Sequence, residues 1–263
     1  MSSNRIFHHL LAQAGDEGRY QVIALVACFI LTVEITSISI LNSFLFYQDP
    51  YQCPSIIDNC HEYVCALPTE QQLTYVNPES SSMLSRFGNF RCETGGEPMT
   101  SQTIIYAGAV VSPLIAALLL KHLKQRQLFL LVLVVSIVGM TITLLSETLL
   151  MATIGLFLNF VSRGMMNGIG FGFMSEVTSE NIRVKYNNWG YMGCGVGGAL
   201  IGLVYWVVRP WEVAFALYQL LPMVALLALV LFVVVDTPFD AVTKGTPAEA
   251  LRQFQKIARI NGQ

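Results

Sequence analysis

Long apolar stretches, separated by short polar segments, make up most of this chain. A helix needs about 20 mostly apolar residues to cross the hydrocarbon core of a bilayer. Six stretches approach or exceed this length, at residues 21–46, 103–120, 128–146, 149–174, 189–208 and 214–235. Charged residues make up only 12% of the chain, about half the share typical of a soluble protein. The pattern predicts an all-α membrane protein with six transmembrane helices over residues 21–235.

The positions of Lys and Arg predict the orientation of these helices. Loops on the cytosolic or matrix side of a membrane carry an excess of both residues. One side of the predicted bundle receives Arg5, Arg19, Lys121, Lys124, Arg126, Arg183, Lys185, Lys244, Arg252, Lys256 and Arg259. The other side receives only Arg86, Arg91 and Arg209. We therefore expect an N-terminal tail, residues 1–20, and the C-terminal segment 236–263 on the cytosolic or matrix side, and we expect no nucleic-acid partner.

A long loop, residues 48–101, separates the first two stretches and contains Cys53, Cys60, Cys65 and Cys92. It falls on the side poor in Lys and Arg, where four cysteines predict two disulfides in an oxidising compartment. Three pairings are open. A zinc site is the competing interpretation, but the spacings contain no pair of C-x-x-C motifs, so we favour disulfides. The loop has no N-x-S/T acceptor, which argues against a glycosylated cell-surface segment.

Small residues recur at helical spacing in two of the stretches: Gly164, Gly168 and Gly172 in one, and Gly190, Gly193, Gly197, Gly198 and Gly202 in the other. Such rows let membrane helices approach closely, so they predict helix packing. The alternative is that the glycines open a substrate path at the middle of the membrane.

Two charged residues lie inside apolar stretches, Glu34 in the first and Arg163 in the fourth. A charge in hydrocarbon is costly, so we expect both to face the bundle interior and to pair with each other. They could form a substrate or proton site, or an ion pair that only holds two helices together. The sequence favours neither interpretation.

The C-terminal segment predicts a short amphipathic helix that begins with a capping box at Thr246 and Glu249. Its apolar face would contain Ala250, Leu251, Phe254, Ile257 and Ala258. An amphipathic helix of this kind is typical of one that lies on the membrane surface or against a partner.

This segment resembles the organic cation and anion transporters of the major facilitator superfamily. After their sixth helix these proteins carry E-S-P-R-W-L-x-x-K-G and then a helix that ends in I-A-x-x-N-G. The matching positions are Asp236, Thr237, Pro238, Lys244, Gly245 and the run 257–262. The cysteine-containing loop is also similar, as is Glu176 with Arg183 seven positions later. The resemblance implies half of a major-facilitator bundle, built as a 3+3 inverted repeat.

The chain departs from that family where the transport cycle operates. The superfamily carries G-x-x-x-D-R-x-G-R-R between its second and third helices, but residues 117–126 read ALLLKHLKQR. The family's Arg at the start of the fourth helix corresponds to Leu156, and its Arg-Trp after the sixth to Phe239 and Asp240. Six helices are also half of what such a transporter needs around its substrate site.

From these features we expect a transporter-derived accessory subunit that no longer transports and sits in a large membrane complex. Its partners would be membrane lipids and other subunits, and the favoured host is a respiratory-chain complex of the inner mitochondrial membrane. The plasma membrane is the alternative location. The alternative function is a half-size transporter of organic ions. It would act as a dimer or with a separately encoded second half, with Glu34 and Arg163 at its site. We expect no enzymatic activity, no cofactor and no metal, because no catalytic constellation stands out.

Overall fold

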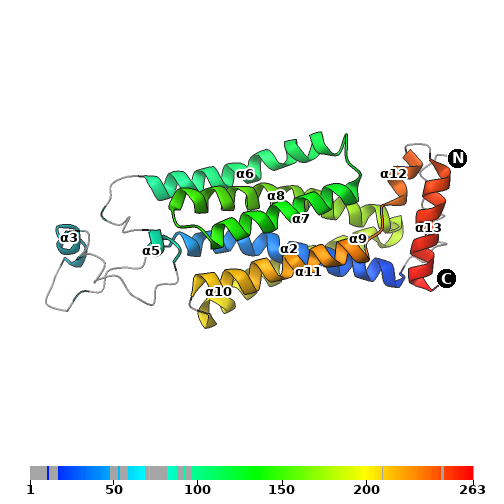
Figure 1. The fold of residues 1–263 in the computed structure, drawn as a ribbon. Helices are drawn as coiled ribbons and strands as arrows, with labels where there is room; N and C mark the ends of the chain where they lie inside the picture. Colours follow the sequence, from blue (N-terminus) through cyan, green and yellow to red (C-terminus); the bar gives the residue numbers. More distant parts are fainter. Residues whose placement is uncertain are drawn as a thin grey trace.

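A computed structural model describes residues 11, 17–47, 53, 59–68, 71, 82–87, 92, 96–208, 210–243 and 246–262. Its long helices run side by side (Figure 1), and within these ranges six helical segments are long and apolar enough to cross a membrane. These are α2 (Arg19–Leu45), α6 (Glu97–Leu119), α7 (Gln125–Leu144), α8 (Leu149–Val177), α9 (Glu180–Val207) and a sixth built from α10 (Trp211–Phe215), η2 (Ala216–Leu220) and α11 (Leu221–Phe232). This confirms the six predicted helices, which fit an integral membrane protein.

The fifth helix begins earlier than its hydropathy predicts, at Glu180 instead of residue 189. The extra turns are polar, so their hydropathy is too low for them to be included in the predicted membrane-spanning stretch. They are still helical because nothing in this stretch breaks a helix, and Glu180 in the first turn interacts favourably with the positive end of the helix dipole. The helix therefore continues past the apolar part.

Several of the long helices pack against helices that are not their neighbours in the sequence. The most extensive contacts join α2 to α9, α6 to α8 and α7 to α8. Close approach requires glycine at several crossings: a Cβ on Gly139 would lie 2.7 Å from the carbonyl oxygen of Gly155, and one on Gly193 would lie 2.7 Å from that of Phe29. The predicted packing role is confirmed at Gly193. At Gly168 and Gly202, however, an added Cβ would meet nothing within 4 Å.

Two disulfides lie in the loop between the first two long helices. One joins Cys53 to Cys60 and the other joins Cys65 to Cys92. The short helices α3 (Cys60–Cys65) and α5 (Leu84–Phe87) belong to this loop and lie at the end of the bundle opposite the C-terminus (Figure 1). The structure thus selects one of the three possible pairings.

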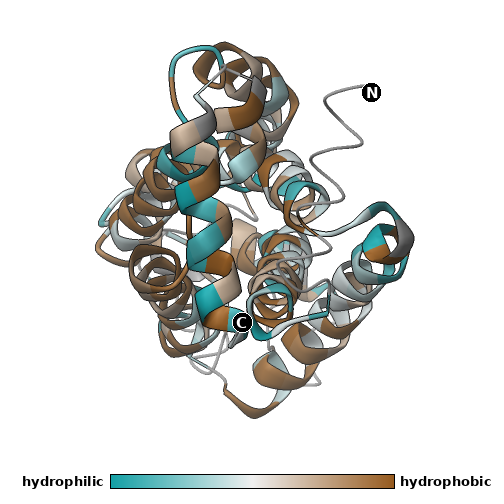
Figure 2. Cartoon of the chain, turned by 90° about the vertical axis from the view of Figure 1, so that its right-hand side faces the viewer, coloured by the Kyte–Doolittle hydropathy of each residue, from teal (hydrophilic) through white to brown (hydrophobic). Residues whose placement is uncertain are grey.

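The C-terminal helices α12 (Pro238–Thr243) and α13 (Pro247–Asn261) lie at the other end, which we call the inner end. There α13 crosses the ends of the long helices (Figures 1 and 2). Its apolar residues Ala250, Phe254 and Ile257 are buried against the chain's own bundle, whereas Leu251 is 57% exposed. The predicted apolar face is therefore largely covered within the chain, not by the membrane surface or a partner.

Polar contacts hold α13 in this position. The side-chain oxygen of Asn261 accepts from the backbone N–H of Tyr20 at 2.9 Å, and its nitrogen donates to Gln21 Oε1 at 3.2 Å. The predicted capping box is wrong: the Thr246 hydroxyl donates to the Ala241 carbonyl, and Glu249 pairs with Lys124. The tertiary ion pair has replaced the local cap, so α13 links the start of α2 to the turn between α6 and α7.

Candidate functional site

The two charges predicted to pair do so in the middle of the bundle. Arg163 on α8 lies with its Nη1 3.4 Å from Oε2 of Glu34 on α2. Their side chains are 2% and 1% exposed. Two long helices that are far apart in sequence are therefore joined by a buried ion pair.

Further hydrogen bonds surround the Arg163 guanidinium. Its Nε donates to Asn159 Oδ1 at 3.1 Å, and its Nη2 donates to Gln219 Oε1 at 3.1 Å. The hydroxyl of Ser136 on α7 also donates to Asn159 Oδ1, at 3.1 Å. The network consequently connects α2, α7, α8 and the π-helix η2. A buried guanidinium needs several acceptors, and here it has a carboxylate and two amide oxygens.

Gln219 was not among the predicted site residues, and the local backbone explains its position. It lies in the π-helical segment Ala216–Leu220 and is completely buried. Pro222 follows three residues later; a proline has no N–H to donate to the fourth residue before it, and its ring clashes with that residue's carbonyl. The helix widens just before the proline, which turns Gln219 toward Arg163. A lone amide shortly before a proline in an apolar run is the signal that could have found it.

A second group of hydrogen bonds extends the network to α9. The Ser37 hydroxyl lies 3.3 Å from the Tyr218 hydroxyl, and both groups lie within 3.4 Å of the carbonyl oxygen of Gly197. Two amide nitrogens in the network, Asn159 Nδ2 and Gln219 Nε2, are buried without a hydrogen-bond partner among the described residues. Five helical elements thus meet around one polar centre.

This arrangement suits an anchor better than an open binding site. Both charges are almost completely buried. Arg163 already pairs with Glu34, donates hydrogen bonds to Asn159 and Gln219, and contacts the sulfur of Met140. A substrate would have to displace these contacts, and this would leave a buried charge without a counter-charge or hydrogen-bond partners. The geometry therefore favours the structural interpretation of the pair.

The family-motif residues lie at the inner end, apart from this pair. Glu176 lies in the last turn of α8, beside Gln125. When the Gln125 amide is oriented with its nitrogen toward this carboxylate, it donates to Glu176 Oε2 at 2.5 Å and accepts from the Phe173 N–H at 2.8 Å. Pro238 begins α12 and is buried, and Arg183 lies in the first turns of α9. Lys244 and Gly245 lie outside the described residues.

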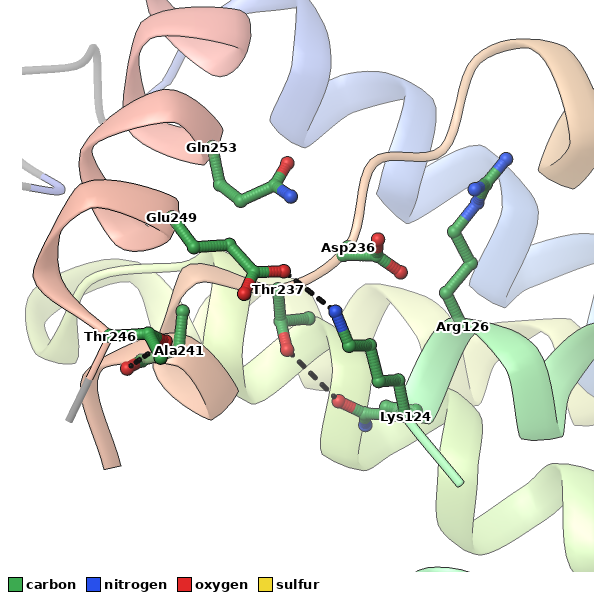
Figure 3. Close-up of a pocket in the computed structure, with 9 residues that line it drawn as sticks. Lys124, Arg126, Asp236, Thr237, Ala241, Thr246, Glu249 and Gln253 are labelled. Carbon is green, nitrogen blue, oxygen red and sulfur yellow. Dashed lines mark hydrogen bonds and ion pairs between the residues drawn. The ribbon is translucent and has the colours of Figure 1, made fainter. Parts of the chain in front are cut away.

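Asp236 lines a cavity of about 80 Å³ at the inner end (Figure 3). The other lining residues include Lys124, Gln125, Arg126, Thr237, Glu249 and Gln253. Lys124 Nζ lies 2.6 Å from Glu249 Oε1, and both side chains are 41% exposed. Two of the motif positions, Glu176 and Asp236, are therefore brought to the turn between α6 and α7.

A different surface, the α8/α9 face, consists of Asn167, Gly168, Gly195 and Gly202, all exposed. The Phe171 and Tyr191 rings stack with centroids 4.1 Å apart, so these residues mark the sides on which α8 and α9 face each other. Helical neighbours lie three or four residues apart. Asn167 and Gly168 therefore continue the side of Phe171, while Gly195 and Gly202 continue the side of Tyr191. The four exposed residues of the α8/α9 face therefore lie on the sides of the two helices that Phe171 and Tyr191 mark.

Comparison with known proteins adds no identification. No protein-family model matches the chain. A search of curated proteins likewise finds no match. Within the described ranges, no three His, Cys, Asp or Glu side chains gather as ligands for a metal ion.

Proposed function

We propose that this chain is a transporter-like half-bundle that acts as a structural accessory subunit of a larger membrane complex. Two inverted repeats of three helices would place the first helix of each repeat against the middle helix of the other. The contacts of α2 with α9 and of α6 with α8 follow this order. The motif positions gathered at the inner end add to the support for a transporter-like origin.

The observation that carries the subunit role is the uncovered amide of Asn167. It lies well inside α8, is exposed, and has no hydrogen-bond partner among the described residues. A polar group that faces lipid without a partner is costly, and interhelical hydrogen bonds from Asn are a common way to satisfy it. Gly168, Gly195 and Gly202 leave room for a neighbouring helix to approach its backbone closely. A second membrane protein on the α8/α9 face would satisfy Asn167 and fill this space.

The structural role of the central ion pair supports the loss of transport. Glu34 and Arg163 are sealed inside the bundle, and the Asp of the superfamily's loop between helices two and three is absent from residues 117–126. For the host we infer a respiratory-chain complex of the inner mitochondrial membrane. The two disulfides lie opposite the end rich in Lys and Arg, which fits an oxidising space across the membrane from the matrix.

The test is to follow the assembly of the chain in the membranes of its own cells. Gly168→Leu/Gly202→Leu would fill the α8/α9 face; both glycines are exposed, and an added Cβ at either position meets nothing within 4 Å. Ala225→Leu/Ala228→Leu is the matched control on α11, where both alanines are exposed. After gentle detergent extraction and native-gel separation, wild type and control should run in a large complex. The glycine variant should be depleted from it at least tenfold.

Retention of the glycine variant in that complex would exclude the α8/α9 face as the contact. Migration of wild type near twice 29.1 kDa would remove the accessory-subunit proposal.

One observation favours a half-size transporter of organic ions that works as a dimer or with a second half. The network contains a π-helix, and π-helical segments are frequent at functional sites. In liposomes that contain the purified chain, this alternative predicts uptake of a small organic cation such as tetraethylammonium. Glu34→Gln should abolish that uptake while dimer formation is kept. Equal uptake by liposomes with and without the protein would exclude it.

A further inference from the structure

A second and larger hollow lies at the inner end, beside the end of α11. It has a volume of about 290 Å³ and is lined by Arg126, the segment 232–236, Lys256, Arg259 and Ile260. We call it the α11–α13 pocket. It shares Arg126 and Asp236 with the smaller cavity but opens on the side of α13 that carries Lys256 and Arg259.

The polar wall of this pocket is cationic. Arg126, Lys256 and Arg259 contribute three positive charges, and Asp236 contributes one carboxylate. The guanidinium of Arg126 is held in place because its Nη2 donates to the carbonyl oxygens of Leu231 at 2.9 Å and Val230 at 3.4 Å. Its Nε is buried and has no partner in the described part of the chain. Lys256 and Arg259 are exposed and form no ion pair with a described residue. The pocket therefore has an excess of positive charge.

The other wall is apolar and belongs to a membrane-spanning helix. Phe232 is the last residue of α11 and is 86% exposed. Val233 and Val235 follow it and are half-buried. This wall lies where the apolar part of the bundle gives way to the polar inner end, so it lies near the boundary between lipid tails and headgroups. A soluble anion would use the cationic wall and leave the apolar wall without a role.

We propose that the α11–α13 pocket binds an anionic phospholipid. Basic pockets at the cytoplasmic or matrix ends of transmembrane helices are suited to acidic headgroups. Arg126, Lys256 and Arg259 would contact the headgroup phosphate, where arginine can form paired charge-assisted hydrogen bonds. The acyl chains would run along Phe232 toward the bilayer. The site does not depend on the proposed partner, because it lies at the inner end and not on the α8/α9 face.

The test uses the purified full chain in detergent and short-chain phospholipids as probes. Thermal unfolding is followed during titration with dioctanoyl phosphatidylglycerol, with dioctanoyl phosphatidylcholine, and with inorganic phosphate. The test variant is Lys256→Gln/Arg259→Gln, and the control is Lys121→Gln/Arg252→Gln. The control removes the same charge from exposed positions at the same end but outside the pocket lining. All four side chains are exposed, so each variant should fold.

Phosphatidylglycerol should raise the unfolding temperature of wild type and control, and phosphatidylcholine should not. The apparent dissociation constant for phosphatidylglycerol should rise roughly thirtyfold in the Lys256→Gln/Arg259→Gln variant, from the usual contribution of two basic residues near a charged headgroup. Equal loss in both double variants would show diffuse attraction at the surface and overturn the proposal. So would an equal response to the two phospholipids, or stabilisation by inorganic phosphate at the same concentration, which would indicate a soluble anion.

Discussion

Two ion pairs of this bundle, Arg163–Glu34 at the centre and Lys124–Glu249 at the inner end, show that the shorter contact need not be the more important one. Lys124 and Glu249 approach to 2.6 Å, but both are 41% exposed. Arg163 and Glu34 are 3.4 Å apart and are 2% and 1% exposed. In water an ion pair is screened and contributes little, whereas a buried pair must be complete because a lone charge there has no compensation. The longer contact should therefore be the more important one.

The surroundings of the two pairs strengthen this difference. The central pair shares its guanidinium with Asn159 and Gln219, so its loss would disturb α2, α8 and η2 together. The surface pair is one of several contacts between α13 and the bundle, alongside the buried side chains of Phe254 and Ile257. The centre depends on one pair of charges, whereas several independent contacts hold the inner end together.

The largest effect is expected when one partner of the central pair is removed. Glu34→Gln leaves the Arg163 guanidinium buried without a counter-charge, and we expect it to lower the free energy of unfolding by about 3–5 kcal/mol. In the double variant Glu34→Leu/Arg163→Met no charge remains, so it should be more stable than Glu34→Gln alone. Unfolding of the chain in mixed micelles, followed by tryptophan fluorescence, measures both. A double variant less stable than the single one would refute this account of the centre.

A smaller effect is expected from a single methyl group at the crossing of α7 and α8. Gly155→Ala would place a Cβ 2.7 Å from the carbonyl oxygen of Gly139, so the helices must move apart at a cost of about 1–3 kcal/mol. The same change at Gly168 meets nothing within 4 Å and should be neutral or stabilising, because alanine favours helix more than glycine does. Thermal unfolding of both variants tests this difference in sign. Equal destabilisation would mean that helix propensity and packing have been misjudged at one of the two sites.

The sequence predicted the six spanning helices because lipid solvation produces a strong signal in hydropathy. It also predicted that Glu34 would meet Arg163, since each was the only charge of its sign in the middle of a span. It did not predict Gln219 as a hydrogen-bond partner of Arg163. That contact depends on the π-helical segment before Pro222, which changes the direction in which Gln219 faces. The placement of α13 was missed for a similar reason: an amphipathic face indicates that something covers it, but not what.

Gln219 allows the centre to be probed without removal of a charge. Gln219→Leu deletes the acceptor 3.1 Å from Arg163 Nη2, and we expect a loss of about 1–2 kcal/mol, between the values for charged hydrogen bonds and for those inside membranes. In the Glu34→Leu/Arg163→Met background the same substitution should cost much less, because its donor is gone. A double-mutant cycle on micellar unfolding gives the coupling. A coupling of zero would show that Gln219 only packs beside the guanidinium.

The smallest effect is expected at the inner end, where Glu249→Gln breaks the pair with Lys124. We expect less than about 1 kcal/mol at low ionic strength, because both groups remain hydrated. The difference from wild type should vanish near 1 M KCl, where charges are screened within about 3 Å, whereas the cost of Glu34→Gln should persist in the dry centre. Micellar unfolding at low and high salt measures both. A cost that survives high salt would mean that Lys124 and Glu249 are desolvated between α13 and the bundle, so that the inner end, like the centre, depends on a single pair of charges.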